Sequence, residues 1–395
     1  IVHRSDLRRP LIVAQVAASF MLLIGTGLMV RSLLNLTGVN PGFSTDHVLT
    51  MQIDMNFTKY RTPAERAAYL DRLLGNLQAI PGVSAVGATG TLPLLEEAGG
   101  SIDALLIAGP DGRNVANGPR ASLMIASDDY FRAMDIPLVD GRFFAASDGF
   151  DASPVVVVNQ AFASGNWPGE SAVGQRISAN GGKRWLTVVG VVANVRQQLA
   201  LEPVAEVYAS MRQVPYVTTN WAIRSPADQA VLVPLVQAAV RATDRDQPIH
   251  RLRTLADVRA ASLAPPRLTA TLLGLFAALA LVITAAGIAG VIAYSVSQRS
   301  QEFGVRVALG ASRTDVVSMV VGEGVRLAVA GLSIGLLGAI VLGAPLSTVL
   351  FGVGPVDAVT YLAVSAVLLG VAALACLLPA LRAASIDPMT ALRAG

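Results

Sequence analysis

Residues 268–294 read LTATLLGLFAALALVITAAGIAGVIAY, a run of 27 residues without a single charged side chain. An α-helix rises about 1.5 Å per residue, so about 20 apolar residues cross the ~30 Å hydrocarbon core of a bilayer. The chain contains three further apolar runs of this kind. As a whole it is 53% hydrophobic and 14% charged, which is too apolar for one water-soluble domain of 395 residues. We predict four transmembrane helices, at residues 11–30, 267–294, 316–342 and 360–381.

The first apolar run, 11–30, has a second interpretation as a cleaved signal peptide, because arginines precede it. Its apolar core is longer than the usual ~7 to 15 residues, and no small-x-small cleavage site lies before Arg31. These features favour an uncleaved membrane anchor. Since the chain begins with Ile1 rather than Met, we expect it to be a fragment or processed piece of a longer protein.

The distribution of arginine predicts the orientation, because short cytoplasmic segments of membrane proteins carry an excess of Lys and Arg. Arginines occur in the N-terminal segment 1–10, in the link 295–315 and in the tail 382–395. The link 343–359 has neither Lys nor Arg. We therefore place the first three segments in the cytoplasm, and we place 343–359 and the large segment 31–266 outside.

The external segment is close to neutral, because residues 32–266 carry 19 Lys and Arg against 21 Asp and Glu. The formal net charge of +3 thus belongs to the membrane-flanking parts. No basic surface interleaved with aromatic residues is visible in this segment, which argues against a nucleic-acid partner. The partner indicated by composition is the lipid bilayer.

The external segment opens with the order strand, helix, strand. Alternating apolar residues predict a half-buried strand over 49–57. Thr62-Pro63-Ala64-Glu65 then supplies an N-cap, a proline at the first helical position and a capping-box glutamate, which predicts a helix to about Ala79. Pro81-Gly82 turns the chain into a second strand at 83–89.

The same order recurs near the end of the segment. A strand is predicted at 221–224, Ser225-Pro226-Ala227-Asp228 is predicted to open a helix, and a strand follows at 249–253. The intervening stretch is richer in strands, glycine and proline. We therefore predict a mixed α/β domain of two lobes, a βαβ-type lobe built from both ends and a strand-rich inserted lobe from roughly 95 to 215.

The sequence contains few residue patterns that are typical of catalytic or metal-binding sites. The three histidines, His3, His47 and His250, have no metal-ligand spacing, and the only cysteine, Cys376, falls inside the fourth apolar run as a small packing residue. The stretch around Lys183 lacks the first glycine and the Ser or Thr of a Walker A loop. We expect no enzymatic activity, no metal and no cofactor in this chain.

The apolar runs also carry few polar groups of the kind that transport ions. Glu323 and Arg326 alone intrude, three residues apart on one helix face, and we expect them to form a pair that snorkels to the interface. Gly331-x-x-x-Gly335 and Gly338 predict a face for close helix packing, either within the bundle or with another subunit. An ion-coupled carrier is therefore disfavoured.

The cytoplasmic link holds the stretch QEFGVRVALGAS at 301–312. Helical spacing over 298–309 places Phe303 and Val307 on one face, and Glu302 and Arg306 form an i,i+4 pair.

Both ends of this short helix carry stop and start signals. Gly310 stands where a C-terminal cap belongs, and Ser312-Arg313-Thr314-Asp315 is a capping box that begins the next helix. A short helix joined rigidly to a membrane helix can transmit a push from a cytoplasmic partner. The alternative is an amphipathic helix lying passively on the headgroups.

The stretch RSQEFGVRVALGASRTDVVSMVV (299–321) resembles the cytoplasmic coupling segment of the MacB/FtsX-type ABC transporter permeases. The resemblance continues in LIVAQVAASFMLLIGTGLMVRSLLNL (11–36), DDYFRAMDIPLVDGRFF (128–144) and LPALRAASIDPMTALR (378–393). It is closest to the tandemly duplicated orphan permeases, of which this chain would be the C-terminal unit.

This resemblance implies four spans, an external domain with a porter-like and a smaller inserted lobe, and a place in the bacterial inner membrane. The implied partners are a separate cytoplasmic ABC ATPase, a second permease unit and, as a further candidate, a periplasmic adaptor. ATP hydrolysis would move the external domain, a mode called mechanotransmission. The contacts to the ATPase would come from Glu302, Phe303, Gly304, Arg306, Ala308, Leu309 and Gly310.

Within the family, substrates range from antibiotics and toxins to lipoproteins, and some members instead regulate a cell-wall hydrolase. Pro345 departs from a smooth third span, which we expect it to kink or end. The alternative function is a membrane-anchored sensor or scaffold with an external binding domain and no ATPase. A membrane-bound enzyme is a weaker third hypothesis.

Overall fold

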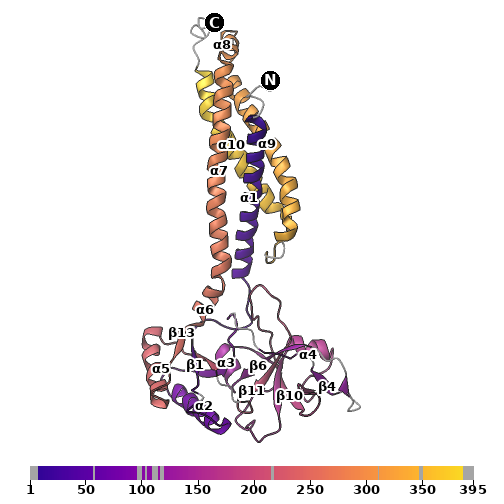
Figure 1. Ribbon diagram of the computed structural model, residues 1–395, viewed down its shortest axis with the longest axis vertical. Helices are drawn as coiled ribbons and strands as arrows, with labels where there is room; N and C mark the ends of the chain where they lie inside the picture. The colour runs from indigo at the N-terminus through magenta and orange to yellow at the C-terminus, as the bar shows by residue number, and fades with distance from the viewer. Residues whose placement is uncertain are drawn as a thin grey trace. The chain divides into compact units, whose positions relative to one another are not determined.

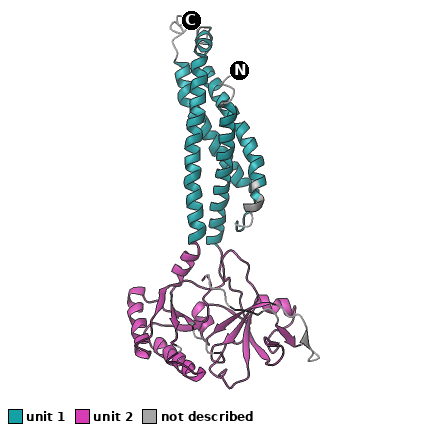
Figure 2. Cartoon of the chain, in the orientation of Figure 1, with its two compact units in different colours: residues 1–38, 264–395 teal, residues 39–263 magenta. Residues whose placement is uncertain are grey.

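The protein is described by a computed structural model (Figure 1). It divides into two compact units, residues 1–38 with 264–395 (unit 1) and residues 39–263 (unit 2) (Figure 2). The residues described are 8–56, 58–95, 100–102, 105–108, 114–115, 120–214, 218–309, 311–346 and 350–385. His3, Gly310 and most of the predicted cytoplasmic tail lie outside these ranges.

Unit 1 is helical. Its helices are α1 (Arg8–Thr37), α7 (Ala264–Gln298), α8 (Ser300–Ala308), α9 (Arg313–Leu346) and α10 (Ala358–Ala384) (Figure 1). All of these except α8 are long and apolar enough to cross a membrane. The four long helices contain the four apolar runs of the sequence. Helix α9 continues through Pro345 to Leu346, where its described part ends.

The core of unit 1 is built around α1, which packs against α7, α9 and α10. Val16, Phe20, Ile24 and Leu28 recur every four residues along α1 and are each at most 2% exposed. By contrast, the outer faces of α7 and α10 expose large apolar side chains such as Leu275. A helical bundle that is apolar outside as well as inside is typical of a membrane domain.

Helix α9 approaches α1 through glycines. A Cβ atom added at Gly331 would lie 2.5 Å from Cβ of Val16, and one added at Gly335 would lie 2.9 Å from the carbonyl oxygen of Ala17. Both distances are shorter than real carbon contacts, so only glycine permits this approach. Gly338 also faces α1, where it meets the flexible side chain of Met21. The predicted small-residue face is thus confirmed, and within this chain it packs on α1.

Unit 2 contains one sheet. Its strands are β1 (Val48–Asp54), β2 (Ala85–Thr89), β3 (Gly100–Ile102), β4 (Leu106–Ala108), β5 (Asn114–Val115), β6 (Ala121–Ala126), β7 (Leu138–Gly141), β8 (Val155–Asn159), β9 (Arg176–Ser178), β10 (Leu186–Val192), β11 (Glu206–Ser210), β12 (Thr218–Arg224) and β13 (His250–Thr254). Its helices are α2 (Pro63–Gln78), α3 (Tyr130–Met134), α4 (Gln160–Asn166), α5 (Gln229–Thr243) and α6 (Leu255–Ser262). The strand order is β13-β1-β12-β2-β6-β11-β8-β10-β9-β4-β5, with β3 beside β6 and β7 beside β10.

The two predicted lobes correspond to two hydrophobic cores on this sheet. The first core joins α2 and α5 to β1, β2 and β12, and includes Tyr69, Leu73 and Trp221. Its strand order, β13-β1-β12-β2, is that of a split βαβ arrangement. The second core surrounds β8, β10 and α4 and includes Val156 and Phe162. The prediction of a βαβ-type lobe and a strand-rich inserted lobe is confirmed.

Helix caps account for where the helices of the first lobe begin. The Thr62 and Glu65 capping box is present as predicted. The predicted start of α5 was three residues early, because the N-cap is Asp228 rather than Ser225. The hydroxyl of Ser225 instead donates to the carbonyl of Gly82 at 2.9 Å, and Asp228 accepts from the amide of Ala230 at 2.8 Å.

Glu206, at the start of β11, is a buried carboxyl group. Tyr208 Oη donates to its Oε2 atom at 2.6 Å, and Gln197 Nε2 donates to its Oε1 atom at 2.6 Å. Burial raises the pKa of Glu206, because desolvation penalises the carboxylate more than these two hydrogen bonds favour it. The charged form is therefore disfavoured in the folded domain.

The glycine contact predicts a stability difference between two alanine variants of α9. Gly331→Ala should destabilise the bundle by about 1–3 kcal/mol, because the new methyl group meets Val16 and the backbone of α1. Gly322→Ala is the matched control, since nothing lies within 4 Å of a Cβ atom there. Thermal unfolding in detergent checks the difference. Equal midpoints for the two variants would contradict the packing described.

Glu206 predicts a pH dependence of stability. Since its folded-state pKa lies above the ordinary 4.5, its contribution to stability is complete below that pH and is lost as the pH rises through the raised value. Glu206→Gln stays neutral and can still bond Tyr208 and Gln197. The variant should gain on the order of 1 kcal/mol at pH 7–8, about 2–4 °C, and little at pH 4.

The tryptophans report this transition, because all three, Trp167, Trp185 and Trp221, lie in unit 2. Unfolding midpoints of wild type and variant measured across this pH range provide the check. Parallel curves would show that Glu206 does not titrate as described.

Candidate coupling segment

Helix α8 is joined closely to both of its neighbours. Arg299 alone separates it from the end of α7. At its other end, the amide of Ser312 donates to Oδ2 of Asp315 at 3.0 Å, and the amide of Asp315 donates to Oγ of Ser312 at 3.2 Å. The predicted capping box is therefore present, and it starts α9 after a link of four residues, 309–312.

The inner face of α8 is anchored in the core of unit 1. Phe303 is 4% exposed and belongs to the same hydrophobic cluster as α1, α7, α9 and α10. Gly304, beside it, is also buried. Of Val307 and Ala308 only the helical backbone is described. The aromatic side chain of Phe303 thus fixes α8 against the bundle.

The outer face of this segment is formed by Gln301 and Val305 on α8 and by Leu309 directly after it. These residues are spaced four apart, so they form a single stripe on a helix. All three are exposed, and Leu309 is 82% exposed. An apolar side chain that is so open on a short helix is a candidate contact for another protein. We call these three residues the outer stripe.

Ion pairs connect α8 to itself and to Arg299, and a hydrogen bond connects it to α9. Glu302 and Arg306 approach to 2.7 Å, which confirms the predicted i,i+4 pair, and Glu302 also lies 3.4 Å from Arg299. Nη1 of Arg306 contacts Sδ of Met319 on α9 at 2.8 Å. Each such half-exposed pair contributes little alone, ~0–1 kcal/mol, but together they fix the orientation of α8.

Glu323 on α9 accepts two arginines from other parts of unit 1. Its distances are 2.6 Å to Arg9 on α1 and 3.7 Å to Arg299 between α7 and α8. The prediction that Glu323 pairs with Arg326 was wrong, because Glu323 pairs with arginines that are distant in the sequence. We call Arg9, Arg299 and Glu323 the arginine–glutamate cluster.

The structure therefore places the seven predicted ATPase contacts in different environments. Glu302 and Arg306 form a half-exposed ion pair, Phe303 and Gly304 are buried, and Leu309 is open. Gly310 lies outside the described residues. The exposed stripe also contains Val305 and Gln301, four and eight residues before Leu309, which the sequence-based prediction did not include.

The described parts of the chain offer no alternative site for metal chemistry. Among those residues, no group of three or more His, Cys, Asp or Glu side chains is placed to hold a metal ion. Cys376 is fully buried in the core of unit 1 and lies against Gly324 on α9.

Two families match this chain. Residues 11–249 match the MacB-like periplasmic core domain, and residues 274–388 match the FtsX-like permease C-terminal region. The first match alone covers more than half of the chain.

Curated relatives include two proteins named "Macrolide export ATP-binding/permease protein MacB". The protein of Marinobacter nauticus is 25% identical over 272 residues, which covers 65% of this chain and 40% of that protein. The protein of Hyphomonas neptunium is 26% identical over 326 residues, covering 78% and 50% respectively. This chain thus spans half or less of the length of these relatives. The "Uncharacterized ABC transporter permease YvrN" of Bacillus subtilis is 25% identical over 286 residues, covering 67% of this chain and 68% of that protein.

Solved structures with similarity include the periplasmic region of MacB from Actinobacillus actinomycetemcomitans. It has 17% sequence identity and a TM-score of 0.35, and the match covers 58% of this chain and 97% of that one. The two family matches, at residues 11–249 and 274–388, show that the chain belongs to the MacB/FtsX-like family of ABC transporter permeases, and its helical unit contains four membrane-length helices.

Proposed function

We propose that this chain is the permease subunit of an ABC exporter-like complex. A separate cytoplasmic ATPase would bind α8 and drive movement of the external domain by mechanotransmission. The observation that carries this proposal is the outer stripe, in which the apolar side chains of Val305 and Leu309 are exposed on a segment whose inner face is anchored by Phe303.

A force applied to α8 would be transmitted to α7 and α9. The joint with α7 is one residue long, and the capping box of Ser312 and Asp315 starts α9 directly after the link. Phe303 holds the middle of α8 in the bundle core. Helix α7 continues along the chain into unit 2 at Leu263. Movement of α8 would therefore displace α7, which is covalently continuous with the external domain.

The composition of the spans supports force transmission over passage of an ion. Glu323 and Arg326 are the only charged residues within 11–30, 268–294, 316–342 and 360–381. Glu323 is already engaged with Arg9 and Arg299. A substrate path through the bilayer would be expected to carry more ionisable groups facing the bundle interior.

We place the complex in a bacterial inner membrane. The link 295–315 and both ends of the chain would lie in the cytoplasm, and unit 2 would lie outside. The distribution of arginine supports this orientation. A second permease unit and a periplasmic adaptor are the further proposed partners.

Leu309→Glu tests the proposed contact. It places a charge on the outer stripe without removing a bond within the bundle, because Leu309 is 82% exposed. The full-length protein is purified by affinity from its native host in detergent, and the ATPase activity that co-purifies is measured. The variant should lose about tenfold or more of that activity, as expected when a charge enters an apolar contact of an interface.

Leu201→Glu in unit 2 is the matched control, since it places the same charge at an apolar residue that is 54% exposed. It should retain the wild-type activity. If Leu309→Glu also retained it, the outer stripe would not be the contact. If no ATPase co-purified with the wild type, a membrane-anchored sensor or scaffold would replace the proposed function.

A further inference from the structure

The external unit contains a cavity of about 170 Å³ beside α2. Its apolar wall includes Leu70 and Leu74, one turn apart on α2, together with Met211 and Trp221 from the sheet side. Leu70, Met211 and Trp221 are nearly fully buried. A cavity of about 150 Å³ lined by such side chains holds a benzene ring, so this one has room for one ring or a short alkyl chain.

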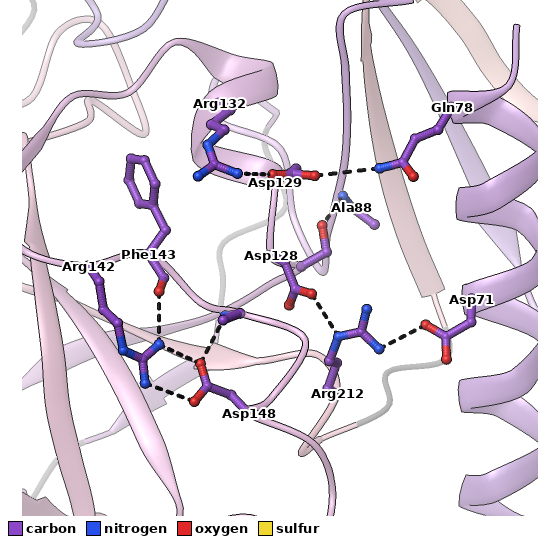
Figure 3. A network of polar contacts seen from close by, with 12 residues as sticks. Asp71, Gln78, Ala88, Asp128, Asp129, Arg132, Arg142, Phe143, Asp148 and Arg212 are labelled. Atoms are coloured by element: carbon purple, nitrogen blue, oxygen red, sulfur yellow. Dashed lines mark hydrogen bonds and ion pairs between the residues drawn. The ribbon is translucent and has the colours of Figure 1, made fainter.

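One edge of the cavity is polar and carries a net negative charge. Nε of Arg212 donates to Oδ2 of Asp128 at 2.7 Å, and its Nη1 atom donates to Oδ1 of Asp71 at 3.0 Å (Figure 3). All three residues line the cavity. Two carboxylates share one guanidinium, so the edge has a formal charge of −1.

Asp128 retains an unused acceptor. Its Oδ1 atom is buried and has no hydrogen-bond partner among the described residues. A buried acceptor without a donor is costly, and the cost is greater for a charged group. If the Asp128 carboxylate turns so that Oδ1 faces the cavity, a ligand that brings a hydrogen-bond donor would relieve this oxygen.

Neighbouring carboxylates do not share this feature. Both oxygens of Asp148 accept from Arg142, at 2.7 and 2.9 Å, and Asp129 accepts from Arg132 at 2.6 Å and from Gln78 at 3.5 Å (Figure 3). Asp128 is therefore the acidic residue of this network with a buried oxygen left over.

We propose that this cavity binds a small primary ammonium ion with an apolar tail. The tail would lie on Leu70, Leu74 and Trp221, and the ammonium group would donate to Asp128 and lie near Asp71. An anionic ligand does not fit, because Arg212 is already paired with both carboxylates. The site belongs to unit 2 alone and does not depend on the proposed ATPase.

Ligand-observed saturation-transfer NMR on the full chain in lipid nanodiscs tests this proposal. The probes are 2-phenylethylamine, its neutral analogue 2-phenylethanol and the anion 3-phenylpropionate, with empty nanodiscs to subtract binding to lipid. The amine should bind with a dissociation constant on the order of 1 mM, as expected for a ligand of its size. The alcohol should bind about tenfold more weakly, because it lacks the charge-assisted hydrogen bond. The anion should not bind.

Two variants locate the site. Asp128→Asn removes the charge and should weaken binding of the amine about tenfold, to the level of the alcohol. Ala67→Leu fills the cavity from a half-buried position on α2 and should abolish binding of the amine and the alcohol alike. Asp129→Asn is the control, because Asp129 does not line the cavity, and it should bind as wild type does.

Three results would overturn the proposal. The first is equal binding of the amine and the alcohol, which would remove the role of charge. The second is retained binding in Ala67→Leu, which would place the ligand elsewhere. The third is no saturation transfer to the amine in the wild type.

Discussion

The close approach of α9 to α1 is the constraint on which the rest of unit 1 depends. Apolar helices gain little by leaving lipid for one another, so they associate through close packing and a few hydrogen bonds. Gly331 and Gly335 allow the α9 backbone to reach α1, and there it covers Val16 and Phe20. The hydroxyl groups of Ser19 and Thr284, 2.7 Å apart, then tie α1 to α7. Helix α1 thereby fixes the positions of both helices that flank α8.

Ion pairs also fix how far the packed helices of unit 1 can slide along one another. A carboxylate near the membrane is costly unless it is paired, and Glu323 meets two arginines from different segments. Arg9 fixes the start of α1, and Arg299 fixes the joint between α7 and α8. Since Arg299 also approaches Glu302, the same side chain connects α8 to α9. The arginine–glutamate cluster therefore aligns three segments that the glycine contact alone would leave free to slide.

The features that the sequence predicted well are local ones. Four apolar runs predicted the four long helices, and the alternating apolar residues at 49–57 predicted a strand where β1 lies. The boxes at Thr62 and Ser312 needed only residues within one turn. The failures involve groups that find distant partners. Glu323 pairs with Arg9 and Arg299 instead of Arg326, and the hydroxyl of Ser225 donates to the carbonyl of Gly82 instead of capping a helix. In both cases a tertiary contact replaces the one that the local pattern predicted. The cavity wall likewise joins α2 to residues more than 140 positions away, which no local periodicity reveals.

The arrangement of α8 also bears on whether it acts or merely rests on the membrane surface. A passive interfacial helix buries its apolar face in headgroups and needs no stiff connection to its neighbours. In α8 the aromatic side chain of Phe303 instead packs within the protein, and among the described side chains Val305 and, directly after the helix, Leu309 are exposed on another face. The short joint at Arg299 and the capping box at Ser312 remove the freedom that a resting helix would keep. A helix with a fixed inner face and an open outer stripe is better suited to receiving a force than to lying on lipid, which is the physical argument for a coupling role.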